Sequence, residues 1–173
     1  MSVTIFAPSS LLSNANNDDE IENAYNGPVY LTNYTFNTMS IDGHVVTGPT
    51  EWDAKNYTLS DPNNDAFAYF QWDYDSLYFG FFYSVEAQSF GDNVTLYLDV
   101  DGDEVRTNNR DICIILNGIN QVYYGIWKSG ISNYENVSAL PTGFEKAVGF
   151  NSSELGYMHY EMQIPMSNIS NPY

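Results

Sequence analysis

The chain has 173 residues, a length that suits one domain with an ordinary hydrophobic core. It carries 22 acidic residues against 5 basic ones, for a formal net charge of -17. Nucleic-acid backbones and anionic membrane surfaces are bound by clustered Lys and Arg, so this composition argues against both partners. No stretch approaches the roughly 20 apolar residues of a membrane-spanning helix.

Two further features of the composition concern fold and compartment. The 15 Tyr and 10 Phe favour strands, where aromatic side chains pack well. The single cysteine, Cys113, cannot form an intrachain disulfide. It lies in the apolar run 111–116, so a buried and unreactive thiol is expected.

Six N-x-S/T sequons favour secretion or display at the cell surface, although they are only a modest excess over chance. Residues 1–8 lack the basic start and long apolar run of a signal peptide, so secretion requires that the signal has been removed. In the segment 93–100 the apolar residues alternate, which places the sequon Asn93 on the outward face. The predicted N-glycosylation sites are Asn33, Asn56, Asn93, Asn136, Asn151 and Asn168.

Residues 1–37 are predicted to form an N-terminal arm, with a short strand-like run at Val3–Phe6 and a solvated acidic stretch at 13–20. The β-sandwich domain is predicted over 38–173. Its first clear elements are the aromatic strands 66–72 and 77–83, which the polar turn 73–76 joins into a hairpin. Both faces of 77–83 are apolar, as in a central strand of a sandwich.

Five more strands are predicted at 93–100, 111–117, 121–128, 143–150 and 157–164, with Gly, Asn and Pro turns between them. No amphipathic helix of three turns is found. Short strands at this spacing predict an all-β fold. We expect an antiparallel β-sandwich, of the two-sheet jelly-roll or immunoglobulin-like kind, with an extended N-terminal arm.

Four sequence features occur in a characteristic order. They are Ile41-Asp-Gly43 followed by Glu51-Trp52, the segment 70–79, the run Leu96-Tyr-Leu-Asp-Val-Asp-Gly-Asp103 before Asp111, and Tyr160-Glu-Met-Gln-Ile-Pro165. Over roughly residues 39–166 this order resembles the family-9 carbohydrate-binding module and the related DOMON domains. The resemblance implies an extracellular β-sandwich that binds sugars or, in some branches, b-type haem.

The resemblance also implies one or two strands beyond Pro165 that this sequence does not contain. A sandwich lacking its last strand has an open edge that invites another strand. The run Val3–Phe6 can fill that edge, within the molecule or in a neighbouring copy. The alternative is that the sequence is a fragment of a longer chain.

Acidic residues cluster at Asp99, Asp101, Asp103 and Asp111. Alternating carboxylates at a strand end suit Ca²⁺, which prefers oxygen ligands, although the spacing is not that of an EF-hand. A solvated turn with Asp side chains capping backbone amides is the other interpretation. A glycosidase pair is not expected, because these carboxylates lie in a polar turn and not in an apolar cleft.

Aromatic side chains on a strand surface can stack on the apolar faces of sugars. Trp127 is the best candidate, and Tyr123 and Gly125 share its face while Tyr124 points to the other. Trp72, in a family-like motif, is a second sugar-binding candidate, although packing is the more usual role for it and for Trp52.

Haem-binding relatives use Met with His or Lys, and the candidates are His44, His159, Met158 and Met162. Because His159 and Met158 are adjacent on one strand, they point to opposite faces, and haem binding is not favoured. No serine-hydrolase, Walker or dinucleotide motif occurs. The favoured function is a non-catalytic glycan-binding module, with possible structural calcium. The alternative is a glycosylated structural subunit of an extracellular filament or surface layer, in which neighbouring copies exchange a strand.

Overall fold

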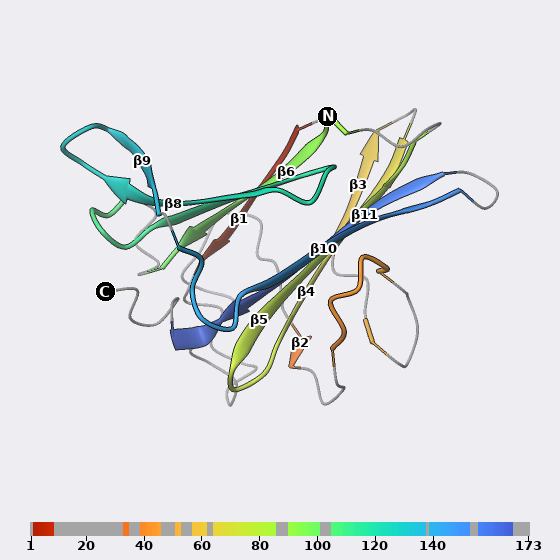
Figure 1. The fold of residues 1–173 in the computed structure, drawn as a ribbon, viewed down its shortest axis with the longest axis horizontal. Helices are drawn as coiled ribbons and strands as arrows, with labels where there is room; N and C mark the ends of the chain where they lie inside the picture. Colours follow the sequence, from red (N-terminus) through yellow and green to blue (C-terminus); the bar gives the residue numbers. More distant parts are fainter. Residues whose placement is uncertain are drawn as a thin grey trace, which may run out of the picture.

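The computed structural model describes residues 2–8, 33–34, 39–45, 51–52, 57–61, 64–85, 90–100, 105–137, 139–152 and 156–167. Its strands form two packed layers (Figure 1). Sheet A has the order β1 (Ser2–Pro8), β6 (Asn93–Asp99), β7 (Ile112–Asn117), β8 (Val122–Lys128) and β9 (Asn133–Asn136). Sheet B has the order β10 (Glu145–Asn151), β11 (Tyr157–Pro165), β5 (Ser76–Ser84), β4 (Asn64–Trp72) and β2 (Asn33–Tyr34), with β3 (Tyr57–Asp61) paired to β4.

The predicted all-β sandwich is confirmed. The expected hairpin is β4 paired antiparallel with β5, and the five later strands lie within about two residues of their predicted bounds. β3 and β9 were not predicted, because their sequences, YTLSD and NYEN, are short and polar and lack an apolar alternation. Each becomes a strand by pairing with a longer neighbour.

The core lies between the sheets and consists of alternate residues of both. Phe79 and Phe81 of β5 are fully buried, with ring centroids 6.5 Å apart and nearly parallel planes. Leu96 and Ile114 of sheet A face them and are also fully buried. This is the two-residue period that the sequence shows, because successive side chains of a strand point to opposite faces.

β5 is buried on both faces, as predicted for a central strand. Its second face carries a smaller cluster in which Trp52 and Tyr69 are almost fully buried, with ring centroids 5.8 Å apart. The segments 39–45 and 51–52 cover this outer face of sheet B. Gly80 makes room for the indole, since a Cβ there would lie 2.8 Å from Trp52 Cζ2.

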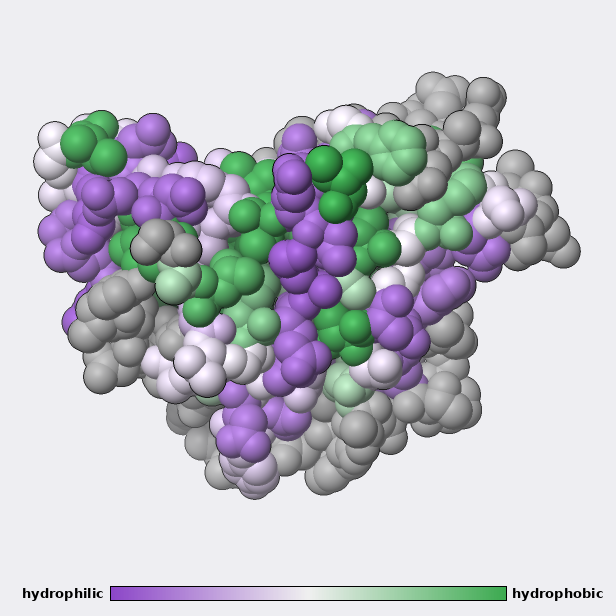
Figure 2. Space-filling model, viewed as in Figure 1, coloured by the Kyte–Doolittle hydropathy of each residue, from purple (hydrophilic) through white to green (hydrophobic). Residues whose placement is uncertain are grey.

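On the side where β8 faces β10, aromatic and polar contacts join the sheets. Tyr124 of sheet A meets Phe144, next to β10, edge-on at 5.9 Å between ring centroids. Lys146 Nζ donates to the backbone oxygen and Oδ1 of Asn120. Figure 2 shows apolar side chains at the surface between the β8–β9 hairpin and the middle of the molecule. Side-chain contacts therefore join the two sheets on this side of the sandwich.

The N-terminal strand β1 runs parallel to β6 over all seven of its residues, from Ser2 opposite Asn93 to Pro8 opposite Asp99 (Figure 1). It forms one edge of sheet A, so the run Val3–Phe6 occupies a sandwich edge within the same molecule. β2 likewise pairs in parallel with β4. Among the described residues, no helix is long and apolar enough to span a membrane.

Candidate functional site

Four aromatic side chains gather on the outer face of sheet A. We call this surface the aromatic platform; it consists of Tyr97 of β6, Tyr123 and Trp127 of β8, and Tyr134 of β9. All four are partly exposed. As predicted, Tyr124 points the other way, into the core, where it is 2% exposed. The alternation of β8 therefore separates a core face from an aromatic face.

The rings of the aromatic platform contact one another across several strands. Trp127 and Tyr134 meet edge-on with centroids 5.2 Å apart, and Tyr134 lies 5.5 Å from Tyr97. The Tyr123 hydroxyl donates to the backbone oxygen of Tyr134 at 2.7 Å. These contacts hold the rings as one surface.

Small residues beneath the rings allow this arrangement. Tyr97, Cys113 and Gly125 lie side by side in register on β6, β7 and β8. A Cβ on Gly125 would lie 2.7 Å from the Tyr123 ring, so only glycine leaves room for it. Cys113 is 3% exposed, which confirms the predicted burial, and burial raises the pKa of its thiol to about 11. Cys113 therefore lies beneath the rings of the aromatic platform, and its thiol is protonated and unreactive at neutral pH.

Charged and amide groups surround Trp127. The Arg106 guanidinium lies over the indole, 4.9 Å from the ring centroid, and 6.0 Å from that of Tyr134. Lys128 Nζ donates to Asn109 Oδ1 at 2.6 Å and lies 3.7 Å from the Glu135 carboxylate. Apolar rings bordered by hydrogen-bonding groups suit a ligand with an apolar face and many hydroxyls.

Sequence reasoning proposed Trp127 and Tyr123 but missed Tyr97, Tyr134 and Arg106. Tyr97 occupies an outward position in the alternating segment 93–100, so the pattern itself contained that signal. Tyr134 lies in β9, which was not predicted, and Arg106 lies in a loop whose position depends on the fold.

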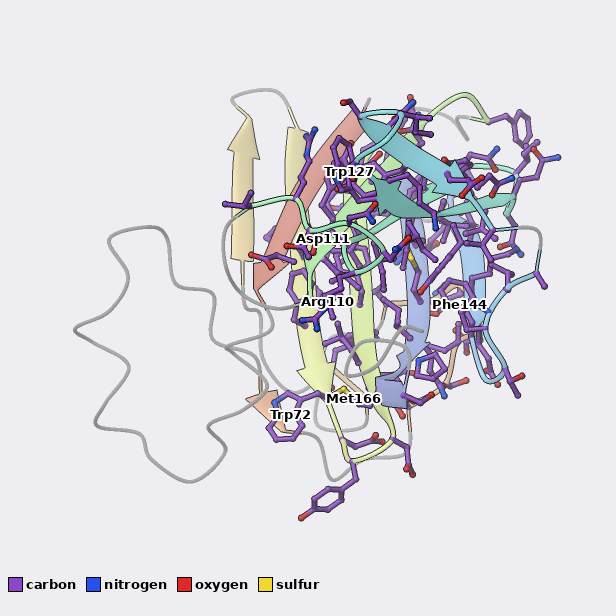
Figure 3. All side chains as sticks on the ribbon, turned by 90° about the vertical axis from the view of Figure 1, so that its left-hand side faces the viewer. Trp72, Arg110, Asp111, Trp127, Phe144 and Met166 are labelled. Atoms are coloured by element: carbon purple, nitrogen blue, oxygen red, sulfur yellow. The ribbon has the colours of Figure 1, made fainter. Side chains whose placement is uncertain are left out.

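Trp72 does not join the aromatic platform. It ends β4 in sheet B and packs, partly buried, against the main core. Figure 3 shows it far from Trp127, near the opposite end of the molecule. Trp52 is 1% exposed and belongs to the smaller cluster on sheet B. Both residues therefore pack against core residues, and sugar binding by Trp72 stays a prediction.

Of the predicted calcium ligands, Asp99 and Asp111 are described, whereas Asp101 and Asp103 lie outside the described residues. Asp111 is 3% exposed and accepts the Thr107 amide at 2.6 Å and the Val100 amide at 3.3 Å. Its carboxylate therefore closes the loop between β6 and β7. Within the described ranges, no three His, Cys, Asp or Glu side chains converge as metal ligands.

A second polar site lies on the outer face of sheet B, around Glu161 of β11. This carboxylate is fully buried. Its Oε2 accepts the amides of Asp42, Gly43 and His44 at 3.0, 2.7 and 3.2 Å, and its Oε1 accepts Trp52 Nε1 at 3.3 Å. Glu161 thus attaches the covering segment 39–45 and the indole to the sheet. Gly43 has φ +88°, a conformation that suits glycine.

Burial raises the pKa of Glu161 to about 7, the hydrogen bonds from Gly43 and Trp52 oppose this change, and the charges of Glu51 and Asp42 add to it. Burial also raises the pKa of Glu51, whose Oε1 accepts the Ser40 amide at 2.8 Å. The covering segment is therefore held by carboxyl groups that take up protons more readily than usual.

Next to Glu161 on the same face lies His159, which is 6% exposed and whose two ring nitrogens have no hydrogen-bond partner. Burial lowers the pKa of His159 to about 4, and nearby His44 adds to the change. Met158 and Met162 are fully buried in the core, on the other face of β11. His159 therefore does not share a face with Met158 or Met162.

Three predicted glycosylation sites have described side chains. Asn136 is exposed, and Asn93 and Asn151 are partly exposed. Val94, Leu96 and Leu98 are buried in the core, which confirms that Asn93 is on the opposite, outward face. Asn33 is described as backbone in β2, and Asn56 and Asn168 lie outside the described residues.

Two packed sheets with a solvent-facing aromatic surface define a β-sandwich module. No family model matches the sequence, and no curated protein matches it. Among solved structures, the chain is similar to a family-9 carbohydrate-binding module from Caldicellulosiruptor kristjanssonii in complex with cellotriose. The identity is 17% and the TM-score 0.51, over 78% of this chain and 65% of that one.

A second structure of such a module from this organism, in complex with glucose, gives 17% identity and a TM-score of 0.50, over 78% of this chain and 68% of that one. The chain therefore has the fold of a family-9 carbohydrate-binding module, as its motifs predicted. It spans 65% of the length of the first of these structures. The resemblance to DOMON domains stays a prediction.

Proposed function

We propose that the protein is a non-catalytic, secreted or cell-surface module that binds glycan through the aromatic platform. The observation that carries this proposal is the partly exposed Trp127, packed against Tyr134 and bordered by Arg106. Apolar sugar faces stack on such rings, and the surrounding cations and amides bind hydroxyls. The similar modules of known structure hold cellotriose and glucose, which supports the same class of ligand here.

Replacing Trp127 by Ala is expected to weaken glycan binding by roughly tenfold or more, because a central Trp of a binding surface contributes about 2 kcal/mol. The measurement is isothermal titration with cellotriose and glucose, preceded by a glycan array to find the best ligand.

The matched control is Tyr74→Ala. Tyr74 is 85% exposed at the β4–β5 turn of sheet B, whereas the aromatic platform lies on sheet A. This variant should bind as the wild type does. Equal glycan affinity in the Trp127 variant and the wild type would refute the aromatic platform as the binding site.

We also propose structural calcium in the segment 99–111, with ligands from Asp99, Asp101, Asp103 and Asp111. The Asp111 carboxylate accepts the amides of Val100 and Thr107, so it lies beside both ends of this segment, and Ca²⁺ prefers such oxygen ligands. Calcium at 100 times its Kd should then raise the free energy of unfolding by about 2.7 kcal/mol. Denaturation with calcium and with EGTA measures this change, and coincident curves would contradict the site.

A structural subunit joined by strand exchange is the second candidate function, and the pairing of β1 with β6 favours it. A strand from the start of the chain that completes a sheet edge can complete the same edge in a neighbouring copy. The acidic, sequon-rich sequence suits a glycosylated extracellular assembly.

If strand exchange occurs, the full chain should sediment as an open polymer at micromolar concentration. Deleting residues 1–8 should then give single soluble modules with an open β6 edge. Analytical ultracentrifugation distinguishes the two states, and a full chain that stays monomeric at all concentrations would rule out this function.

A further inference from the structure

The only two histidines of the chain, His44 and His159, lie far apart in the sequence and next to each other in space. Their ring centroids are 5.3 Å apart, with an angle of 32° between the planes. His44 belongs to the covering segment 39–45, and His159 belongs to β11. The pair lies on the outer face of sheet B, so it is separate from the aromatic platform on sheet A.

The two rings are held in different ways. His159 packs against Phe82, with centroids 5.5 Å apart, and against Tyr157, at 6.4 Å. The His44 side chain is exposed, but its backbone amide is fixed by Asp42 Oδ1 at 2.9 Å and by Glu161 Oε2. The His159 imidazole is therefore held by packing, whereas the His44 imidazole is exposed to solvent beside it.

The two ring nitrogens of His159 are buried polar atoms without a hydrogen-bond partner on the outer face of sheet B; the Tyr160 hydroxyl, on the core face of the same strand, is the third such atom among the described residues. Both nitrogens are inaccessible to solvent and neither has a hydrogen-bond partner. The residue as a whole is only 6% exposed. Nearly all buried polar atoms in native proteins have a partner, and an exception points to a water or an ion. Glu161, two residues further along the strand, is not a partner of either nitrogen, since its hydrogen bonds go to the segment 39–45 and to Trp52.

The spacing of the rings suits a shared metal ion. At Zn–N distances of roughly 2.0–2.1 Å, the centroids of two imidazoles on one tetrahedral ion lie roughly 5 Å apart. Imidazole nitrogen is a ligand for zinc, copper and nickel, whereas calcium prefers oxygen. We propose that His44 and His159 bind one first-row transition-metal ion, and that water completes its coordination.

The test uses the full, metal-free chain and isothermal titration with zinc chloride. The expected result is one zinc ion per chain at micromolar concentration. Because the chain has no other histidine and its cysteine is buried, His44→Ala and His159→Phe should each weaken binding at least about tenfold. His159→Phe keeps a ring beside Phe82 and removes the two unpartnered nitrogens, so this variant should fold.

A second readout is copper(II) electron paramagnetic resonance, which should show coupling to two imidazole nitrogens in the wild type and to one in either variant. Asp75→Asn, an exposed carboxylate in the β4–β5 turn, is the matched control and should bind zinc as the wild type does. No saturable zinc binding, or equal binding in the wild type and both histidine variants, would overturn the proposal. Glycan binding is measured separately on the other sheet, so the two results can fail independently.

Discussion

Replacing Glu161 by Leu should lower the free energy of unfolding at pH 7 by about 3 kcal/mol or more, because each buried donor left without an acceptor costs about 1–3 kcal/mol. The amides of Asp42, Gly43 and His44 and the Trp52 indole would all lose their acceptor. Leucine fills a similar volume, so the loss would come from unsatisfied donors and not from a cavity. Urea denaturation followed by tryptophan fluorescence measures the change.

Gln163→Leu is the matched control. Gln163 lies two residues further along β11 on the same face, and its amide donates to Ser76 Oγ at 3.1 Å. This substitution should cost about 0.5–1.5 kcal/mol, as for an ordinary hydrogen bond. If both variants lost the same small amount, Glu161 would not be the anchor of the segment 39–45.

Stability should depend on pH in opposite directions in two single variants. The pKa of Glu161 is raised from its ordinary value of 4.5 to about 7, so the folded state binds the extra proton between these values. Its contribution is therefore present below pH 4.5 and is lost as the pH rises through 7. The pKa of His159 is lowered from 6.5 to about 4, so its contribution is present above pH 6.5 and is lost as the pH falls through 4.

Each of these contributions to the free energy of unfolding amounts to roughly 3 kcal/mol. Because they change with pH in opposite directions, their pH dependences nearly cancel in the wild type between pH 4.5 and 6.5. His159→Phe should leave the Glu161 effect, so that its stability relative to the wild type falls as the pH rises over this range. Glu161→Gln should leave the His159 effect, so that its relative stability rises. Denaturation curves at pH 4 to 8 in EDTA measure both, and parallel pH profiles for all three proteins would contradict the two shifts.

The alternation of apolar side chains made the sandwich predictable. In β5 and β6 every second residue is aliphatic or aromatic, and this local pattern alone requires two buried faces for β5 and one for β6. Trp127 and Tyr123 could be proposed as surface aromatics for the same reason. The motif 160–165 also pointed to the family-9 fold, although it gave no role to Glu161.

The sequence by itself therefore determined the fold class, most strand positions and the face of each strand residue, because these depend on neighbours in the chain. Only the tertiary structure decided which faces meet. Tyr134 and Arg106 join Trp127, and Glu161 and His159 lie under the segment 39–45, through contacts between residues that are far apart in the sequence. The physical reason is that burial, hydrogen bonding and pKa depend on what packs against a side chain, and no local pattern specifies that partner.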